Sequence, residues 1–455
     1  MPKRQSGILH AAFEAFRGSK CLAAVWIVLT VAMWIHVTAF DFAKDDLNFL
    51  ELRTASDCVR LADGARINFR LTQPFAYLVN YRLFGLNATT LHWSSLVLHV
   101  CNGLLLFGIA SRILVSHRAA FVCVLLWGVL PGNAVSIAWI VNHVDLLCAF
   151  FSFSCVLLLL MAAGAVRVSI RRGCYALAFI SYALAVLSKE NALPLVLCVL
   201  VMATRYYGSL RVALCRVAPF FIPPVSYVLY ISMRGVNFLA QNPPGSSFPT
   251  LSLPGQIAVK LFHYAEAQAL LIVPIPAFPS SSWAVAYIIF LTILVWVTWM
   301  GRGLTGHWQL LGDLAICTAI MMIPAAATSS LRIFYVPSAA FALTVVCGVM
   351  NCLGAARVQH KALAACCAFS ILALLYGMGR RISQNFSPSA DTVRAELCAK
   401  LQEAKDRDRT VADRLNQMCD RTDCCGPMRA GGPTNVYLNH YYEDRIAWVR
   451  RFLKQ

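Results

Sequence analysis

Residues 21–48 read CLAAVWIVLTVAMWIHVTAF followed by DFAKDDLN, and this stretch decides the fold class. Its first part, 21–40, holds no acidic side chain, no lysine and no arginine. About 20 such residues are what an α-helix needs to cross a bilayer. The run is long for a secretory signal and has no small-residue cleavage pattern before Asp41. We therefore expect an uncleaved first membrane span.

The composition of the whole chain points the same way. Of its 455 residues, 59% are apolar and 13% are charged, against roughly 25% charged in an ordinary soluble protein. Apolar runs recur as far as Met378 with short polar breaks. Since backbone polar groups in a bilayer must be satisfied within each span, the runs predict helices. We expect an all-α polytopic membrane protein of about eleven spans, near 21–40, 90–111, 118–131, 144–165, 174–188, 190–205, 217–232, 282–300, 310–327, 335–354 and 362–378.

The formal charge of +18 is spread over one set of loops and does not form a single patch. These loops hold fifteen Lys or Arg against Glu14 alone, which is the positive-inside signature of cytoplasmic segments. By contrast, 41–89 balances six basic against six acidic residues and is expected outside. The basic loops predict anionic membrane lipids as partners, and no nucleic-acid motif is present. The cytoplasmic segments are 1–20, 111–118, 166–173, 205–216, 301–309 and 355–361.

These patterns predict three parts: a cytoplasmic N-terminus at 1–20, a transmembrane domain at 21–379 and a small soluble helical tail at 380–455. The transmembrane domain has a large first external loop, 41–89, and a second external loop, 233–281. Within the latter, 257–276 is apolar but carries several polar residues. We expect a re-entrant or interfacial helix there, because a full span, the alternative, would put the following basic loops on the wrong side.

A few cysteines fall outside the apolar runs. Cys58 and, in the tail, Cys398, Cys419, Cys424 and Cys425 are expected to face an oxidising compartment and are able to form disulfides, although spacing does not reveal the pairing. A zinc site is the rival interpretation of the tail group, but no Cys-x-x-Cys pair occurs there.

Two adjacent carboxylates, Asp45 and Asp46, follow the first span directly. Because they repel each other, the pKa of one tends to rise, which suits a general base for an acceptor hydroxyl. A solvated helix N-terminus, where Asp is stabilised by the helix dipole, is the plainer interpretation.

Further polar residues break the apolar runs at the same expected external face. Some have a plain explanation: Lys189 beside Glu190 fits a salt-bridged span end, Arg332 fits a snorkelling side chain, and His99 fits a satisfied core histidine. Together, cations facing a carboxylate pair suit a reaction whose leaving group is a phosphate. The residues are Arg70, His92, His99, Asn142, His143, Asp145, Lys189, Glu190, Arg332 and Tyr335.

Several segments follow one another along the chain. They are the carboxylate pair, Asn68–Thr72, Tyr81–Asn87, Leu91-His92, His99, Leu130–Val135, Asn142–Leu147, Leu187–Asn191 and Arg332–Ser338. In this order they resemble segments of GT-C fold glycosyltransferases, especially the TMTC-type and PMT-type protein mannosyltransferases and their bacterial relatives. The similarity spans about residues 20–380, and the tail lacks the repeat array of the TMTC type, so the bacterial relatives fit better.

The resemblance implies an inverting glycosyltransferase that moves a sugar from a polyprenyl-phosphate-type lipid donor to a protein or glycan/lipid acceptor at the outer face of the membrane. In this family pattern Asp45 matches the catalytic base, with Asp46 its neighbour. Lys189, Arg332 and Arg70 match positions near the donor phosphate or sugar. His143, Glu190 and Tyr335 complete the expected donor-binding set.

The resemblance also implies no cofactor, with a divalent metal as the alternative that is not favoured. The expected location is the bacterial inner membrane, with the active site facing the periplasm and a role in the cell envelope. An endoplasmic reticulum membrane is the alternative, because it would preserve the same topology. A transporter or flippase of a lipid-linked glycan is the alternative function, since polar residues in spans also mark translocation paths, but no repeated halves with broken helices stand out. A non-catalytic assembly partner is a third interpretation.

Overall fold

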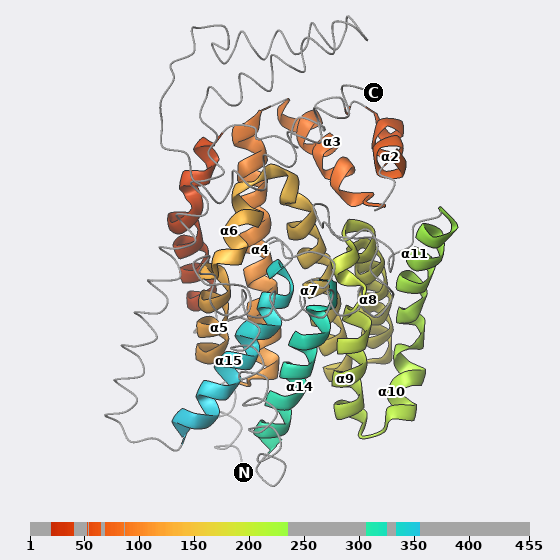
Figure 1. The fold of residues 1–455 in the computed structure, drawn as a ribbon. Helices are drawn as coiled ribbons and strands as arrows, with labels where there is room; N and C mark the ends of the chain where they lie inside the picture. Colours follow the sequence, from red (N-terminus) through yellow and green to blue (C-terminus); the bar gives the residue numbers. More distant parts are fainter. Residues whose placement is uncertain are drawn as a thin grey trace, which may run out of the picture. The chain divides into compact units, whose positions relative to one another are not determined.

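The computed structural model describes residues 20–40, 52, 54–64, 69–85, 87–234, 306–324 and 334–354. These residues form helices and no strand, as the sequence predicts (Figure 1). After the first span, Lys20–Ala39, whose last turn is the 3-10 helix η1 (Ile35–Ala39), the elements follow in chain order. They are α2 (Ala55–Gly64), α3 (Thr72–Phe84), α4 (Ala88–Ile113), α5 (His117–Val129), α6 (Pro131–Ala138), η3 (Ile140–Asn142), α7 (His143–Gly164), α8 (Val168–Ser188), η4 (Glu190–Ala192), α9 (Leu195–Tyr207), α10 (Leu210–Val217), η5 (Ala218–Phe221), α11 (Ile222–Met233), α14 (Gly306–Met321) and α15 (Pro337–Gly354).

Within this part of the chain, five helices are long and apolar enough to cross a membrane. They are Lys20–Ala39, Ala88–Ile113, Ile140–Gly164, Val168–Ser188 and Leu210–Met233. A sixth candidate is the bent pair of α5 and α6, where Pro131 begins the second helix. The chain is therefore an integral membrane protein.

Other expected spans are shorter in the structure or lie outside the described residues. The run expected at 190–205 becomes the short helix α9, which begins only at Leu195. Those expected at 310–327 and 335–354 correspond to α14 and α15, whose apolar parts are also short. The expected spans at 282–300 and 362–378, the segment 257–276 and the tail 380–455 lie outside the described residues.

Local sequence explains where several helices begin and end. The Asn87 side chain accepts a hydrogen bond from the Thr89 N–H and starts α4, and Ser116 does the same for α5 through Ala119. Such side chains satisfy backbone donors that the first helical turn leaves free. Gly208 ends α9 in the left-handed conformation, with φ of 65°, which glycine adopts without steric cost.

The first span packs on the bundle through one large ring. The Trp26 indole is fully buried against Gly103 of α4 and Gly128 of α5, and its Nε1 donates to the Val100 carbonyl at 3.2 Å. A Cβ at either glycine would collide with this ring. Small residues at these two positions thus allow the first span to approach closely.

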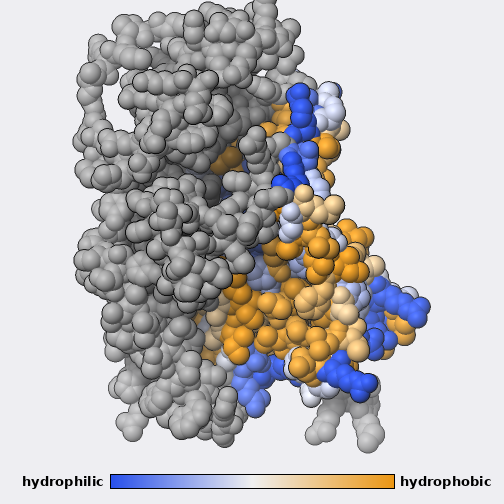
Figure 2. Space-filling view, turned by 45° about the vertical axis from the view of Figure 1, so that its right-hand side comes forward, coloured by the Kyte–Doolittle hydropathy of each residue, from blue (hydrophilic) through white to orange (hydrophobic). Residues whose placement is uncertain are grey.

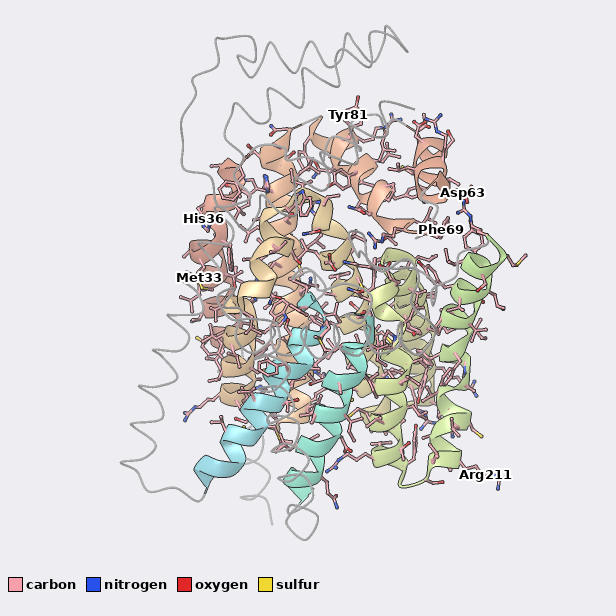
Figure 3. All side chains as sticks on the ribbon, viewed as in Figure 1. Met33, His36, Asp63, Phe69, Tyr81 and Arg211 are labelled. Atoms are coloured by element: carbon pink, nitrogen blue, oxygen red, sulfur yellow. The ribbon has the colours of Figure 1, made fainter. Side chains whose placement is uncertain are left out.

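The two ends of the bundle carry different residues. The ends of α2 and α3, with Asp63, Phe69 and Tyr81, lie at one end, whereas Arg211 marks the other (Figure 3). On the face shown in Figure 2, an apolar surface separates hydrophilic residues above and below it. We call these the Glu190 end and the Arg211 end, after a residue of the candidate site and the labelled arginine.

Candidate functional site

Arg70 and Glu190 form a two-point ion pair at the Glu190 end. The Arg70 Nη2 lies 2.6 Å from Glu190 Oε1, and Nε donates to Oε2 at 3.3 Å. Each side chain keeps about a quarter of its surface exposed, 25% and 24%. Arg70 precedes α3, and Glu190 follows α8, so the pair ties the expected first external loop to the bundle.

Backbone and side-chain hydrogen bonds surround this pair. The Leu71 N–H donates to the Leu187 carbonyl at 2.9 Å, and the Thr72 hydroxyl donates to Ser188 Oγ at 2.7 Å. The Gln73 amide donates to the Val141 carbonyl before α7. The start of α3 is therefore docked onto the ends of two neighbouring spans.

Lys189 and Asp145 form a second ion pair, inside the bundle. The Lys189 Nζ lies 2.5 Å from Asp145 Oδ1, and the two side chains are only 4% and 1% exposed. Asp145 lies in the first turn of α7. A charge pair this deep is stable only because the charges compensate each other.

The backbone explains why neighbouring residues have different partners. Lys189 leaves α8 in an extended conformation, with φ of −158° and ψ of 144°. Successive side chains of an extended chain point in opposite directions. Lys189 therefore reaches inward to α7 while Glu190 reaches outward to Arg70, so the two do not form the salt bridge with each other that the plainer interpretation of the sequence allows.

The two positive and two negative charges compensate each other, but the two ion pairs differ in their exposure to solvent. Glu190 lies in the connection between α8 and α9. Burial raises the pKa of its carboxyl, but the charges of Arg70 and Lys189 outweigh burial and hold that pKa at about 2. Burial also lowers the pKa of the Arg70 guanidinium, but Glu190 outweighs it and raises that pKa. Both groups stay ionised at neutral pH. Of the two cations, Arg70 is partly exposed to solvent, whereas Lys189 is buried.

His143 is buried at the start of α7. Its Nε2 is 3.1 Å from the Ser95 hydroxyl of α4, and the ring of Tyr77 from α3 meets the imidazole edge-on with centroids 5.6 Å apart. The side chain thus joins α7, α4 and α3 and is buried between them.

Tyr335 is also fully buried and joins distant parts of the chain. Its hydroxyl is 2.7 Å from His99 Nδ1 and accepts from the Asn102 amide at 3.2 Å, both on α4. Its carbonyl accepts from Trp127 Nε1 at 3.2 Å. The start of α15 is therefore bound to α4 and α5 by a polar network in the core.

The structure brings together most of the predicted site residues that it describes. Arg70, Lys189 and Glu190 meet in paired contacts, with Asp145 as the fourth member. Asp45, Asp46 and Arg332 lie outside the described residues. Sequence reasoning missed Ser95, Gln73 and Asn102. For Asn102 a signal existed, because it lies three residues after His99 on one helix face within an apolar run.

Metal-ligating side chains do not cluster in the part of the chain that the structure describes. No group of three or more His, Cys, Asp or Glu there is placed to hold a metal ion. Since Asp45 and Asp46 are not among these residues, the expectation of no metal stays a prediction.

No protein-family model matches the chain, and no curated protein matches it. Among solved structures, it is similar to the oligosaccharyltransferase of Archaeoglobus fulgidus in complex with zinc and sulfate, with a TM-score of 0.53, 16% identity, and coverage of 91% of this chain and 59% of that one. The oligosaccharyltransferase AglB from Archaeoglobus fulgidus, in complex with an inhibitory peptide and a dolichol-phosphate, gives a TM-score of 0.50, 12% identity, and coverage of 91% of this chain and 61% of that one. ArnT from Cupriavidus metallidurans bound to undecaprenyl phosphate gives a TM-score of 0.45, 18% identity, and coverage of 87% of this chain and 74% of that one.

The likeness to the oligosaccharyltransferase confirms the predicted resemblance to GT-C glycosyltransferases, at the level of the fold. The chain spans about three fifths of the length of that protein. The identity is low, so the shared fold alone does not carry over the substrate, the acceptor or the residues of the archaeal enzyme.

Proposed function

Because the chain has the GT-C fold, we propose that it is an inverting glycosyltransferase. It moves a sugar from a polyprenyl-phosphate-type lipid donor to a protein or glycan acceptor at the outer face of the membrane. The observation that carries this proposal is the Arg70–Glu190 pair, in which a partly exposed cation of the expected first external loop, the loop that also bears Asp45 and Asp46, binds Glu190. The fold and the sequence motifs supply the reaction class.

Arg70 is the best-placed described residue for the donor phosphate. A guanidinium binds phosphate with two parallel hydrogen bonds, as it binds a carboxylate. In the resting protein Glu190 occupies this position, and its exposed edge leaves room for exchange. The phosphate of the donor displaces the carboxylate or shares the guanidinium with it, so the cation is held in the productive orientation before the donor arrives.

Lys189 acts differently in this proposal. Its ammonium is buried and bound by Asp145, so it contributes by positioning and not by direct contact with phosphate. By fixing the end of α8 to the start of α7, the pair sets the position of Glu190 and, through it, of Arg70. His143 and Tyr335 are positioning residues of the same kind, and Arg332 remains a proposed second cation for the phosphate.

The chemical step needs one base and one stabilised leaving group. Asp45, with Asp46 beside it, accepts the proton of the acceptor hydroxyl. The acceptor oxygen attacks the anomeric carbon from the face opposite the phosphate, the bond from that carbon to the phosphate oxygen breaks, and the configuration inverts. The electron pair leaves with the lipid phosphate, whose charge Arg70 neutralises.

We place the reaction in the bacterial inner membrane with the active site toward the periplasm, because the basic loops mark the opposite side as cytoplasmic. No cofactor is assigned. The structure of archaeal AglB with an inhibitory peptide and a dolichol-phosphate supports lipid-phosphate donors and peptide acceptors as the first substrates to try.

The proposal is tested by transfer of labelled sugars from polyprenyl-phosphate donors to acceptors in a membrane extract. The purified full chain is compared with Asp45→Asn, with Asp57→Asn as the matched control: the same substitution in the same expected loop, on a carboxylate that binds Thr54 and Arg60. We expect transfer by the wild type and the control and a loss of at least about 100-fold in Asp45→Asn.

Two other outcomes would argue against this proposal. Full activity of Asp45→Asn removes this residue from the mechanism. No transfer by the wild type with any donor, together with movement of a lipid-linked glycan across proteoliposomes, favours the flippase alternative.

A further inference from the structure

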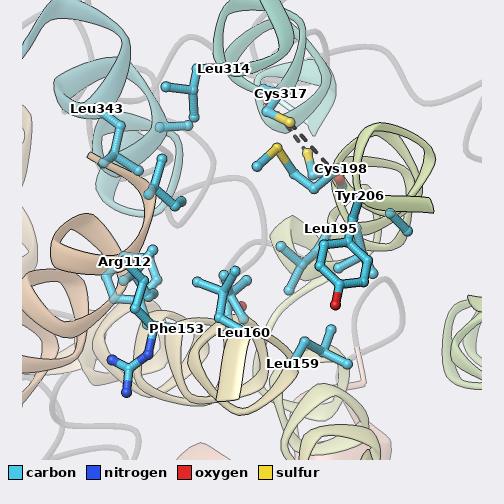
Figure 4. Close-up of a pocket in the computed structure, with 18 of the residues that line it drawn as sticks. Arg112, Phe153, Leu159, Leu160, Leu195, Cys198, Tyr206, Leu314, Cys317 and Leu343 are labelled. Atoms are coloured by element: carbon cyan, nitrogen blue, oxygen red, sulfur yellow. Dashed lines mark hydrogen bonds between the residues drawn. The ribbon is translucent and has the colours of Figure 1, made fainter. Parts of the chain in front are cut away.

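A cavity of about 810 Å³ lies toward the Arg211 end, among α4, α7, α9, α14 and α15 (Figure 4). Its walls are mostly apolar, with Phe153, Leu160, Leu195, Leu314 and Leu343 among them. Natural ligand cavities have volumes of about 300–1,000 Å³. The cavity is therefore large enough for a substantial apolar ligand.

The lining also includes basic and phenolic residues, which come from helix segments toward the Arg211 end. They include Arg112, Arg205 and Arg216 together with Tyr175, Tyr206 and Tyr207, and among the described lining residues none is acidic. These residues come from the end of α4, the start of α8, the end of α9 and from α10. The cavity thus combines an apolar interior with a basic, hydroxyl-bearing mouth.

The contacts at the mouth show which groups remain available. Arg205 is paired with Asp313 at 2.8 Å, which compensates its charge. The Tyr175 and Tyr207 hydroxyls meet at 3.3 Å, and Arg216 acts electrostatically on Tyr175. Arg216 is exposed, so a cation and two hydroxyls face the same small region. Arg112 lies on another helix of the mouth.

This cavity is separate from the candidate catalytic site. None of the four residues in the two ion pairs lines it. On α4 the cavity extends from Leu106 to Ile113, whereas His143 of the candidate site contacts that helix nearer its start, at Ser95. The cavity therefore does not belong to the proposed donor site.

We infer that the cavity binds an anionic glycerophospholipid of the inner leaflet. An acyl chain fills the apolar interior, and the phosphate is held by Arg216 with the hydroxyls of Tyr175 and Tyr207. The positive-inside pattern places this end toward the cytoplasm, where the leaflet is anionic, and basic pockets between spans on that side bind lipid phosphates. Guanidinium groups suit this task because their planar donors match phosphate oxygens. The inference does not depend on glycosyl transfer.

The test measures lipid binding to the purified full chain by native mass spectrometry, with phosphatidylglycerol and phosphatidylcholine of the same acyl chains as probes. Arg216→Ala removes the proposed phosphate ligand, and Arg211→Ala is its matched control, an arginine at the same end that does not line the cavity. Ala203→Trp fills the cavity from α9, and Leu177→Trp places the same ring on an exposed position of α8.

We expect tighter binding of phosphatidylglycerol than of phosphatidylcholine. Arg216→Ala should lower this preference about fivefold, the effect of one basic side chain near an anionic headgroup. Ala203→Trp should lower occupancy by both lipids, while the two controls match the wild type. Thermal unfolding of each variant identifies any that do not fold.

Three results would overturn the inference. One is equal binding of the two lipids by the wild type. Another is a loss in Arg211→Ala as large as in Arg216→Ala, which would indicate general surface charge. The third is displacement of phosphatidylglycerol by a polyprenyl phosphate at lower concentration, which would assign the cavity to a donor-type lipid.

Discussion

Changing Lys189 to Met is expected to destabilise the protein strongly, because it leaves the Asp145 carboxylate buried without its partner. The pair is only 4% and 1% exposed, and Asp145 Oδ2 has no hydrogen-bond partner in the described part of the chain. Breaking a buried ion pair costs about 3–5 kcal/mol, whereas replacing both charges with apolar residues of similar volume is often near neutral. We therefore expect a loss of about 3–5 kcal/mol for Lys189→Met or Asp145→Leu alone.

The double variant Asp145→Leu/Lys189→Met separates this explanation from a general packing defect. It should recover most of the loss, which gives a coupling energy of about 3 kcal/mol or more. The free energy of unfolding is measured by titrating detergent-solubilised protein with SDS. The control is Arg60→Met, which breaks the pair with Asp57 whose arginine is 79% exposed, with an expected cost of about 1 kcal/mol or less. Single losses no larger than this control, or strict additivity in the double variant, would refute the reasoning.

Three further changes are measured by the same titration. Glu190→Gln should cost about 1–2 kcal/mol at pH 7; since its folded pKa is held below the unfolded value of about 4.3, this contribution is present above that pH and is lost as the pH falls toward 2. A difference from wild type that disappears between pH 6 and 8 would contradict the ion pair with Arg70. Gly103→Ala should cost about 1–3 kcal/mol by overpacking against the Trp26 ring, and a neutral effect would place the first span elsewhere. Tyr335→Phe should cost about 1–3 kcal/mol, because it removes the hydroxyl that pairs with buried His99 Nδ1 and accepts from the Asn102 amide; unchanged stability would count against this network.

The membrane architecture follows from the sequence to a large extent. The spans at 21–40, 90–111, 144–165 and 174–188 match helices that the structure contains, within a few residues at the ends. A bilayer imposes this result, since a long uncharged run has one favourable conformation in hydrocarbon. Helix boundaries near polar residues were harder to predict. For example, α9 begins only at Leu195, because the extended residue Lys189 and the 3-10 turn η4 lie between α8 and α9.

The sequence singled out several residues of the candidate site but did not predict which residues they contact. Arg70, His143, Lys189 and Glu190 stood out because charged and polar residues are costly at span ends. Ser95 and Gln73 did not, since small polar residues are common in apolar helices and near loops. Their significance comes only from the partners that they meet.

By itself, the sequence determined that this protein lies in a membrane, which loops carry its positive charge and which polar residues interrupt its spans, because hydropathy and charge act locally along the chain. Only the tertiary structure decided that Lys189 binds Asp145 while Glu190 binds Arg70. That division depends on the extended backbone at Lys189 and on how α3, α7 and α8 pack together. Such contacts join residues 44 and 120 positions apart, and no local pattern encodes them.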